Sequence, residues 1–149
     1  MLLAFCCLAC WSLHAAGVPR QRAGKYEVTL RLPSDGLYAG VEMEIEFRVV
    51  DATQVDPALG PTPVVRARIQ GTIEMPSMPG MPKMEEIGHP DGVPGDYGIH
   101  PTFAHGGDYV LRLEVAPPED AAFSARFPLQ VQDTGGTSAR RVRRPFRWN

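Results

Sequence analysis

Four methionines recur at intervals of three residues near the middle of the chain, and their side chains could bind a metal. Met75, Met78, Met81 and Met84 lie in the segment Met-Pro-Ser-Met-Pro-Gly-Met-Pro-Lys-Met, and a proline follows each of the first three. A thioether is a soft, polarizable ligand that suits Cu(I), and it binds without losing a proton. The spacing therefore predicts a copper site, with Cu(I) as the expected ion. The alternative is that the methionines fill gaps at one end of a hydrophobic core.

The prolines restrict how this segment can place its sulfur atoms. Proline disfavours helix at its own position and at the residue before it, so an extended or polyproline-like segment is expected. A polyproline II helix has three residues per turn and rises about 3.1 Å per residue, which would space the four sulfurs by roughly 9 Å along one edge. One ion would reach several of them only if the segment closed as a loop, for which Gly80 offers a bend.

Three histidines could complete such a site, because neutral imidazole is a common ligand for copper and zinc. His89 follows the last methionine, and His105 lies in a turn before two glycines. His100 is out of phase with Tyr97 and Ile99, so in a strand it would point away from the core. We expect one or more of these histidines to join the four methionines in a mixed site. The alternative for each is a solvated or hydrogen-bonded loop residue.

The first 17 residues predict export. An apolar run over residues 2–13 ends in small residues, and no Asp, Glu, Lys or Arg precedes Arg20, as in a signal peptide. The run is shorter than the roughly 20 apolar residues of a membrane span, although a short anchor or a lipidated Cys10 are alternatives. All three cysteines lie in this segment. The mature chain, expected in the periplasm or attached to the outer side of a membrane, therefore has no disulfide and no cysteine metal site.

Charge and missing motifs exclude several functions. Residues 24–133 carry eight Lys or Arg against seventeen Asp or Glu, a net charge of −9, which argues against nucleic acid as a partner. The chain has no Ser-x-x-Lys or Gly-x-Ser-x-Gly motif and no glycine-rich phosphate loop, so no enzyme is predicted. Glu42, Glu44 and Glu46 alternate along one predicted strand, and we interpret them as a solvated sheet face.

The alternation of apolar and polar residues predicts an all-β fold. No segment shows helical periodicity, and breakers predict a turn over 33–36 and a loop over 56–63. Strands are expected over 25–32, 41–49, 64–74, 95–103, 108–115 and 122–131. Six or seven short strands in about 110 residues indicate an antiparallel β-sandwich, a single domain over 24–133.

The last residues, 134–149, form a basic tail that cannot build a core and is expected to be disordered. Its candidate contact residues are Arg140, Arg141, Arg143, Arg144 and Trp148. Arginine with aromatic residues could contact an anionic membrane surface or an acidic partner, and a solvated tail is the alternative.

Three segments together resemble a known group of domains. They are Glu-Met-Pro-Ser-Met-Pro-Gly-Met over 74–81, Gly-Asp-Tyr over 95–97 and Phe-Ala-His-Gly-Gly-Asp-Tyr over 103–109. The combination resembles the YtkA-like and FixH-like exported domains. The resemblance implies an immunoglobulin-like sandwich, a Met-Pro-Gly-Met loop near histidines, and a copper-handling or oxidase-assembly protein as partner. FixH-like members keep a membrane anchor, whereas this chain has only a short apolar start.

Two functional hypotheses follow from these observations. The first is an exported copper-binding or copper-delivery module that uses the methionine segment and nearby histidines. The second is a non-catalytic interaction module of an envelope complex, in which the methionine segment is a hydrophobic contact. Only the first requires sulfur, rather than bulk, at the methionine positions.

Overall fold

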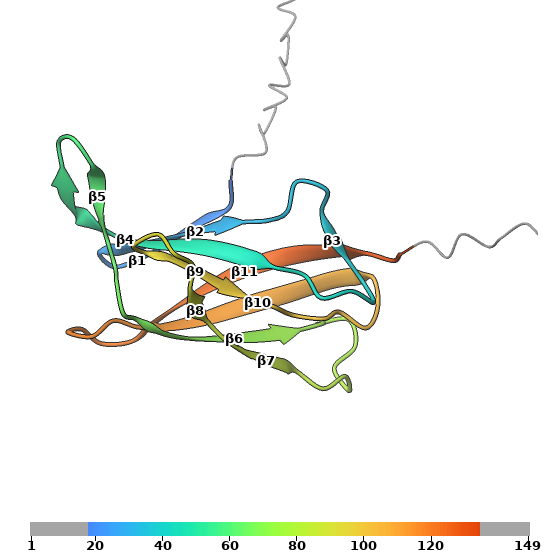
Figure 1. Cartoon of the computed structure of the whole chain (residues 1–149). Coiled ribbons are helices and arrows are strands. Elements are labelled where there is room, and N and C mark those ends of the chain that lie inside the picture. Colours follow the sequence, from blue (N-terminus) through green and yellow to red (C-terminus); the bar gives the residue numbers. More distant parts are fainter. Residues whose placement is uncertain (1–17, 135–149) are drawn as a thin grey trace, which may run out of the picture.

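The computed structural model of the chain describes residues 18–134, so the predicted signal and the basic tail with its candidate contact residues lie outside the described residues. Two sheets pack face to face (Figure 1). The first contains β1 (Arg20–Ala23), β2 (Tyr26–Arg31), β4 (Ile45–Asp56), β9 (Asp96–Ile99) and β8 (His89–Pro90), with β5 (Gly60–Pro63) paired to β4. The second contains β3 (Leu37–Tyr38), β11 (Phe123–Gln132), β10 (Gly107–Ala116), β6 (Arg68–Glu74) and β7 (Met84–Ile87).

The predicted all-β, immunoglobulin-like sandwich is confirmed. The described residues form eleven strands, six in the first sheet and five in the second, whereas six or seven were predicted. Every pairing is antiparallel except that of β3 with β11, which is parallel and departs from the purely antiparallel prediction. The described residues contain no helix long and apolar enough to cross a membrane.

The core lies between the two sheets and comes from alternate residues of the long strands. Leu30 and Phe47 of the first sheet are fully buried, as are Leu111 and Leu113 of the second. Each such side chain contributes roughly 1.5–3 kcal/mol by leaving water. The alternation that predicted β2, β10 and β11 is therefore the pattern that holds the sheets together.

Four sequence predictions of strand and loop bounds are wrong. The strand predicted over 64–74 begins only at Arg68, and the strand predicted over 95–103 ends at Ile99. The strand predicted over 41–49 begins only at Ile45, since Val41 is exposed and Glu42 forms a single isolated bridge to Thr102. The loop predicted over 56–63 is instead a hairpin, in which β4 continues to Asp56 and pairs with β5. The Asp56 carboxylate accepts hydrogen bonds from the amides of Ala58 and Leu59, at 2.7 and 2.9 Å, and so closes the turn.

The prolines that suggested a loop are tolerated there for a structural reason. Pro61 and Pro63 lie on β5, which pairs only with β4 and is an edge strand. An edge strand can lack amide donors on its free side.

The domain also begins earlier than predicted. Strand β1 starts at Arg20, four residues before the predicted start at residue 24.

The chain crosses from one sheet to the other between β7 and β8. The Gly88 amide donates to the Ile69 carbonyl at 2.9 Å, and a Cβ on Gly88 would lie 2.8 Å from the Ile69 Cβ. Only glycine fits this approach, because real Cβ contacts are longer. The crossing leaves β7 on β6 and brings His89, the next residue, onto β9 of the first sheet.

An ionic cluster joins the β10–β11 connection to the first sheet. Lys25 Nζ lies 2.8 Å from the Asp120 carboxylate and 3.5 Å from that of Asp51, and the Tyr26 hydroxyl donates to Asp120. The Tyr26 ring also stacks on Phe123, with centroids 4.7 Å apart. Two hydrogen bonds lower the pKa of Asp120 below its usual value; the one from Lys25 has the larger effect, and the one from Tyr26 adds to it.

This lowered pKa predicts how the stability of the fold depends on pH. Because the carboxyl is more acidic in the folded chain, its stabilisation is present above the unfolded pKa of about 4 and is lost as the pH falls below it. In urea unfolding between pH 7 and pH 3, Asp120→Asn should be less stable than the parent chain at pH 7, and the difference should shrink in acid. The control is Asp108→Asn, because Asp108 is exposed and forms no ion pair among the described residues. A difference for Asp120→Asn that is constant with pH would contradict this.

Candidate metal-binding residues

The methionine segment between β6 and β7 folds as two consecutive β-turns. The Met78 amide donates to the Met75 carbonyl at 3.0 Å, and the Met81 amide donates to the Met78 carbonyl at 2.9 Å. Pro76 and Pro79 occupy the second position of each turn, where their restricted φ is favourable. The extended, polyproline-like prediction is therefore wrong. Turn ends lie within about 7 Å between Cα atoms, closer than the roughly 9 Å repeat of a polyproline helix.

The prolines, and not Gly80, make the bend. Gly80 is not among the glycines with positive φ, and a Cβ added to it would meet no atom within 4 Å. A positive φ is what would have required glycine at the third position of a turn. The backbone at Gly80 is therefore compatible with any residue, and the loop shape depends on the two Met-Pro steps.

The four methionine side chains lie in different environments. Met75 is 6% exposed and belongs to the core, where its Cε packs against Gly107. Met81 and Met84 are partly buried and pack against the core from its edge. Met78 is 47% exposed at the shared residue of the two turns. Core packing thus describes Met75, while the exposed Met78 and the partly buried Met81 form the tip of the loop.

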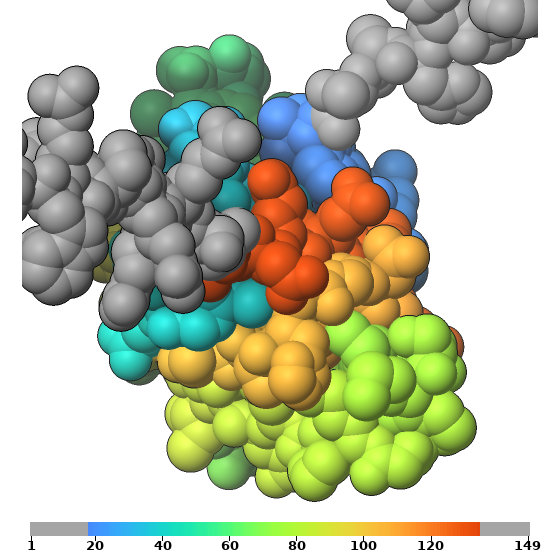
Figure 2. Space-filling view, turned by 90° about the vertical axis from the view of Figure 1, so that its right-hand side faces the viewer, coloured from blue at the N-terminus to red at the C-terminus, as the bar shows by residue number. Residues whose placement is uncertain are grey.

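His105 lies at the same end of the sandwich as the methionine loop. It is exposed in the connection from β9 to β10, two residues before the Gly107 that contacts Met75. Its backbone carbonyl accepts a hydrogen bond from the Tyr109 hydroxyl at 2.9 Å. Figure 2 faces this end, where the methionine loop in yellow-green lies below the orange residues that begin β10.

The other two histidines form a pair on the outer face of the first sheet. The His89 and His100 rings stack, with centroids 4.7 Å apart and planes 8° apart. His100 is exposed, so the predicted orientation away from the core is confirmed. The His89 ring covers Gly98, its partner on β9. These two histidines thus lie outside the first sheet, whereas Met75, Met81 and Met84 pack on the core side.

Three carboxylates converge near this histidine pair, and the sequence did not point to them as a group. Oxygen atoms of Glu44, Glu46 and Asp91 all lie within 4.8 Å of one another. The alternation along 41–49 showed that Glu44 and Glu46 share the solvent face. Asp91 joins them only because β8 pairs with β9, a contact between strands that no local pattern reports.

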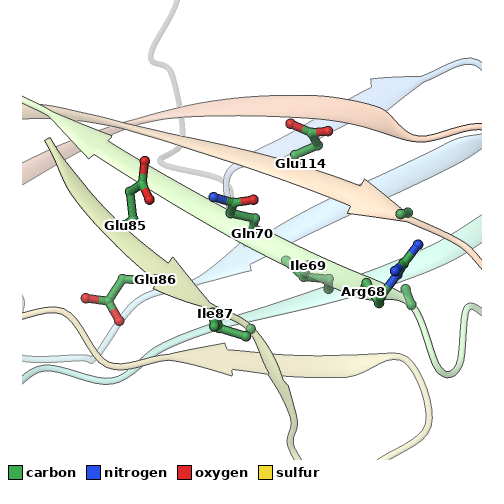
Figure 3. A pocket seen from close by; sticks show the side chains of 10 residues that line it. Arg68, Ile69, Gln70, Glu85, Glu86, Ile87 and Glu114 are labelled. Atoms are coloured by element: carbon green, nitrogen blue, oxygen red, sulfur yellow. The ribbon is translucent and has the colours of Figure 1, made fainter.

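A hollow lies elsewhere, on the second sheet along β6 and β7 (Figure 3). It has a volume of about 690 Å³, and its lining combines Ile69 and Ile87 with Glu85, Glu86 and Glu114. Ile87 is 84% exposed, an unusual environment for an aliphatic side chain on an edge strand. The hollow offers a contact surface of mixed polarity rather than a site with converging ligands.

The contact between Met75 and Gly107 gives a test of how the methionine loop is anchored. Gly107 has a φ of +142°, and a Cβ there would lie 2.8 Å from the Met75 Cε. Gly107→Ala should therefore lower the free energy of unfolding by more than about 1 kcal/mol in urea unfolding. Gly80→Ala is the matched control and should leave it unchanged or raise it by about 0.4–1 kcal/mol. Equal effects of the two substitutions would contradict this anchoring.

Comparison with known proteins places the chain in a family. A search of curated protein sequences found no match. The crystal structure of a DUF4426 family protein from Pseudomonas aeruginosa PAO1 is similar with a TM-score of 0.53 and 13% identity, over 76% of this chain and 94% of that one. The ZirS C-terminal domain is similar with a TM-score of 0.44 and 14% identity, over 70% of this chain and 65% of that one. The first likeness concerns the fold alone. The YtkA-like family model matches residues 20–114, well over half of the sequence, and the chain therefore belongs to the YtkA-like family.

Proposed function

We propose that this chain is an exported, non-catalytic copper-binding module that holds Cu(I) at the tip of its methionine loop. Its expected role is delivery of the ion to a copper-handling or oxidase-assembly protein. The double turn carries the proposal, because it places the exposed Met78 and the partly buried Met81 at the two ends of one turn. Membership of the YtkA-like family supports the coarser part, an exported accessory domain.

The chemistry of the tip suits this ion. Cu(I) prefers soft thioether sulfur, and the flexible methionine side chain lets two sulfurs separated by one turn approach the same ion. Met84 is the next thioether along the chain, and His105 could add an imidazole from the neighbouring connection. Met75 is left out of the proposed ligand set because its side chain is buried against Gly107.

Ligand type also agrees with the proposed location outside the cytoplasm. Thiols oxidise to disulfides in such compartments, whereas thioethers form none. The chain has no cysteine after Cys10, so removal of residues 1–17 would leave methionine and histidine as its soft and borderline ligands. A copper module built this way would keep its ligands in an oxidising environment.

The second candidate function is a protein-interaction module. The observation that favours it is exposed apolar surface, namely Met78 at the loop tip and Ile87 beside the hollow of the second sheet. Here the methionine side chains would serve as flexible hydrophobic contacts. Bulk and apolar character would then suffice, and leucine would replace methionine without loss.

Anaerobic titration of the purified chain with Cu(I), against a competing chelator, separates the two functions. The parent chain should bind one Cu(I). The double variant Met78→Leu, Met81→Leu keeps similar volume and should weaken binding by at least about tenfold, a loss of about 1.4 kcal/mol. Met75→Leu is the matched control and should bind Cu(I) as the parent does, because that sulfur is buried.

Two outcomes would reject the proposed site. Absence of Cu(I) binding by the folded parent chain would leave the interaction module as the better function. Equal loss in Met75→Leu and in the tip variant would show that the sulfurs act through packing and not as ligands. A separate His105→Gln variant reports whether the imidazole takes part.

A further inference from the structure

We propose a second metal site, on the outer face of the first sheet, that takes a divalent transition-metal ion. Its ligands are the carboxylates of Glu44, Glu46 and Asp91 and the imidazole of His89. The proposal goes beyond the copper function and does not depend on it, since none of the four residues belongs to the methionine loop.

The register of the first sheet brings these groups together. Glu46 on β4 pairs with Gly98 on β9, and Gly98 in turn pairs with His89 on β8, so the three residues form one row across the sheet. Gly98 has no side chain, which leaves room for the His89 ring over it. The point where a Cβ on Gly98 would stand is 3.3 Å from His89 Nε2 and 3.7 Å from Glu44 Oε1. Both atoms therefore lie over the same glycine.

In the described residues, no ion pair balances the charge of the three carboxylates, although Arg31 on β2 is the register partner of Glu46. Their oxygens lie within 4.8 Å of one another, where like charges repel. The nearby arginines, Arg31 and Arg48, instead contact the buried Asp96 at 2.9 and 3.1 Å. Among residues 18–134, Glu44, Glu46 and Asp91 form no ion pair. A bound cation would supply the missing positive charge.

The imidazole of His89 provides an independent observation. Its Nε2 is buried and has no hydrogen-bond partner within the described part of the chain. Buried polar atoms are nearly always paired, so an unpaired ring nitrogen near the Glu44 carboxylate calls for a ligand. On the other side of the ring, Nδ1 lies 3.4 Å from the Pro90 carbonyl. A proton on Nδ1 would face that oxygen and leave the Nε2 lone pair for a metal.

His100 is better placed to orient His89 than to bind the same ion. The two rings are stacked and nearly parallel, so their nitrogen lone pairs lie in separate planes and cannot converge on one ion. His100 covers one face of the His89 ring and restricts its rotation. His89 is not part of the group of carboxylates that lie within 4.8 Å of one another, so binding of one ion by all four residues requires a side-chain rotation.

The donor set defines the class of metal. Carboxylate oxygen with one imidazole nitrogen suits divalent first-row ions such as Mn²⁺, Cu²⁺ and Zn²⁺. Ca²⁺ and Mg²⁺ prefer oxygen alone, and Cu(I) prefers sulfur. Zn²⁺ is therefore a suitable probe, because it fits this site, undergoes no redox change and binds poorly to the thioethers of the loop tip.

Isothermal titration of the purified chain with Zn²⁺ at neutral pH tests the site, with Ca²⁺ in a parallel titration. The parent chain should bind one Zn²⁺ and prefer it to Ca²⁺. Loss of even an outer-shell partner of a metal site commonly lowers metal affinity 10–100-fold. Loss of a direct ligand in His89→Gln or Glu46→Gln should therefore weaken Zn²⁺ binding by at least about tenfold. Asp108→Asn and Glu85→Gln change exposed carboxylates of the second sheet; they are the matched controls and should bind as the parent does.

Two further measurements keep the test independent of folding defects. In the parent chain, Zn²⁺ should shift the imidazole nitrogen resonances of His89 and leave those of His105 unchanged. Gly98→Ala removes no ligand, but its Cβ would lie 3.0 Å from His89 Cε1 and displace the ring, so it should also weaken Zn²⁺ binding.

Several results would overturn the proposal. They are absence of Zn²⁺ binding by the parent chain, Ca²⁺ binding of equal strength, unchanged His89 resonances, or equal losses in the two control variants. Each of these outcomes concerns the outer face of the first sheet alone. The result of the Cu(I) titration of the methionine loop does not depend on any of them.

Discussion

The close approach of Gly88 to Ile69 is the contact on which both candidate sites depend. At this point the chain leaves the second sheet, where β7 pairs with β6, and enters the first, where β8 pairs with β9. The methionine loop precedes the crossing and is therefore held against the core of the sandwich. His89 follows it and is placed on the outer face of the other sheet. A larger residue at position 88 would separate the strands and disturb both arrangements.

The two sites differ in the physical means that build them. The methionine loop is shaped locally, by two Met-Pro steps that each favour a turn, and is anchored by burial of Met75. The outer-face cluster is shaped by pairing across β4, β9 and β8, with the His89 ring lying over Gly98. Soft sulfur and harder nitrogen and oxygen are thus presented on different parts of one small domain. If both proposed sites bind metal, such separation would let each select an ion by ligand chemistry rather than compete for the same one.

Charge on the first sheet shows how neighbouring groups can have opposite roles. Asp96 is buried, but Arg31 and Arg48 compensate it, so it joins β2, β4 and β9 on their outer side. The three carboxylates beside it lack such partners. The edge strand β7 shows another use of charge, because Glu86 alternates with the outward Glu85 and packs near Gly71. A charge directed inward at an edge discourages pairing with another chain.

Local sequence determined much of this protein. The strict alternation in β2, β10 and β11 identified strands and their buried faces, because a strand turns successive side chains to opposite sides. The same rule placed His100 outward, and the spacing of methionine and proline identified the loop. Local patterns failed where another strand decides the structure: the proline-rich segment after Asp56 became an edge strand only because β4 was available to pair with it.

Tertiary structure alone decided which residues meet. Four methionines with equal spacing look equivalent in the sequence, yet packing against Gly107 buries Met75 and leaves Met78 exposed. Glu44, Glu46, His89 and Asp91 come from two segments more than forty residues apart, and only the register of β8 on β9 and of β9 on β4 brings them together. Strand order and register depend on the energy of the whole core. The sequence by itself therefore determined the elements and the chemical character of their side chains, and the packing of the two sheets determined the sites.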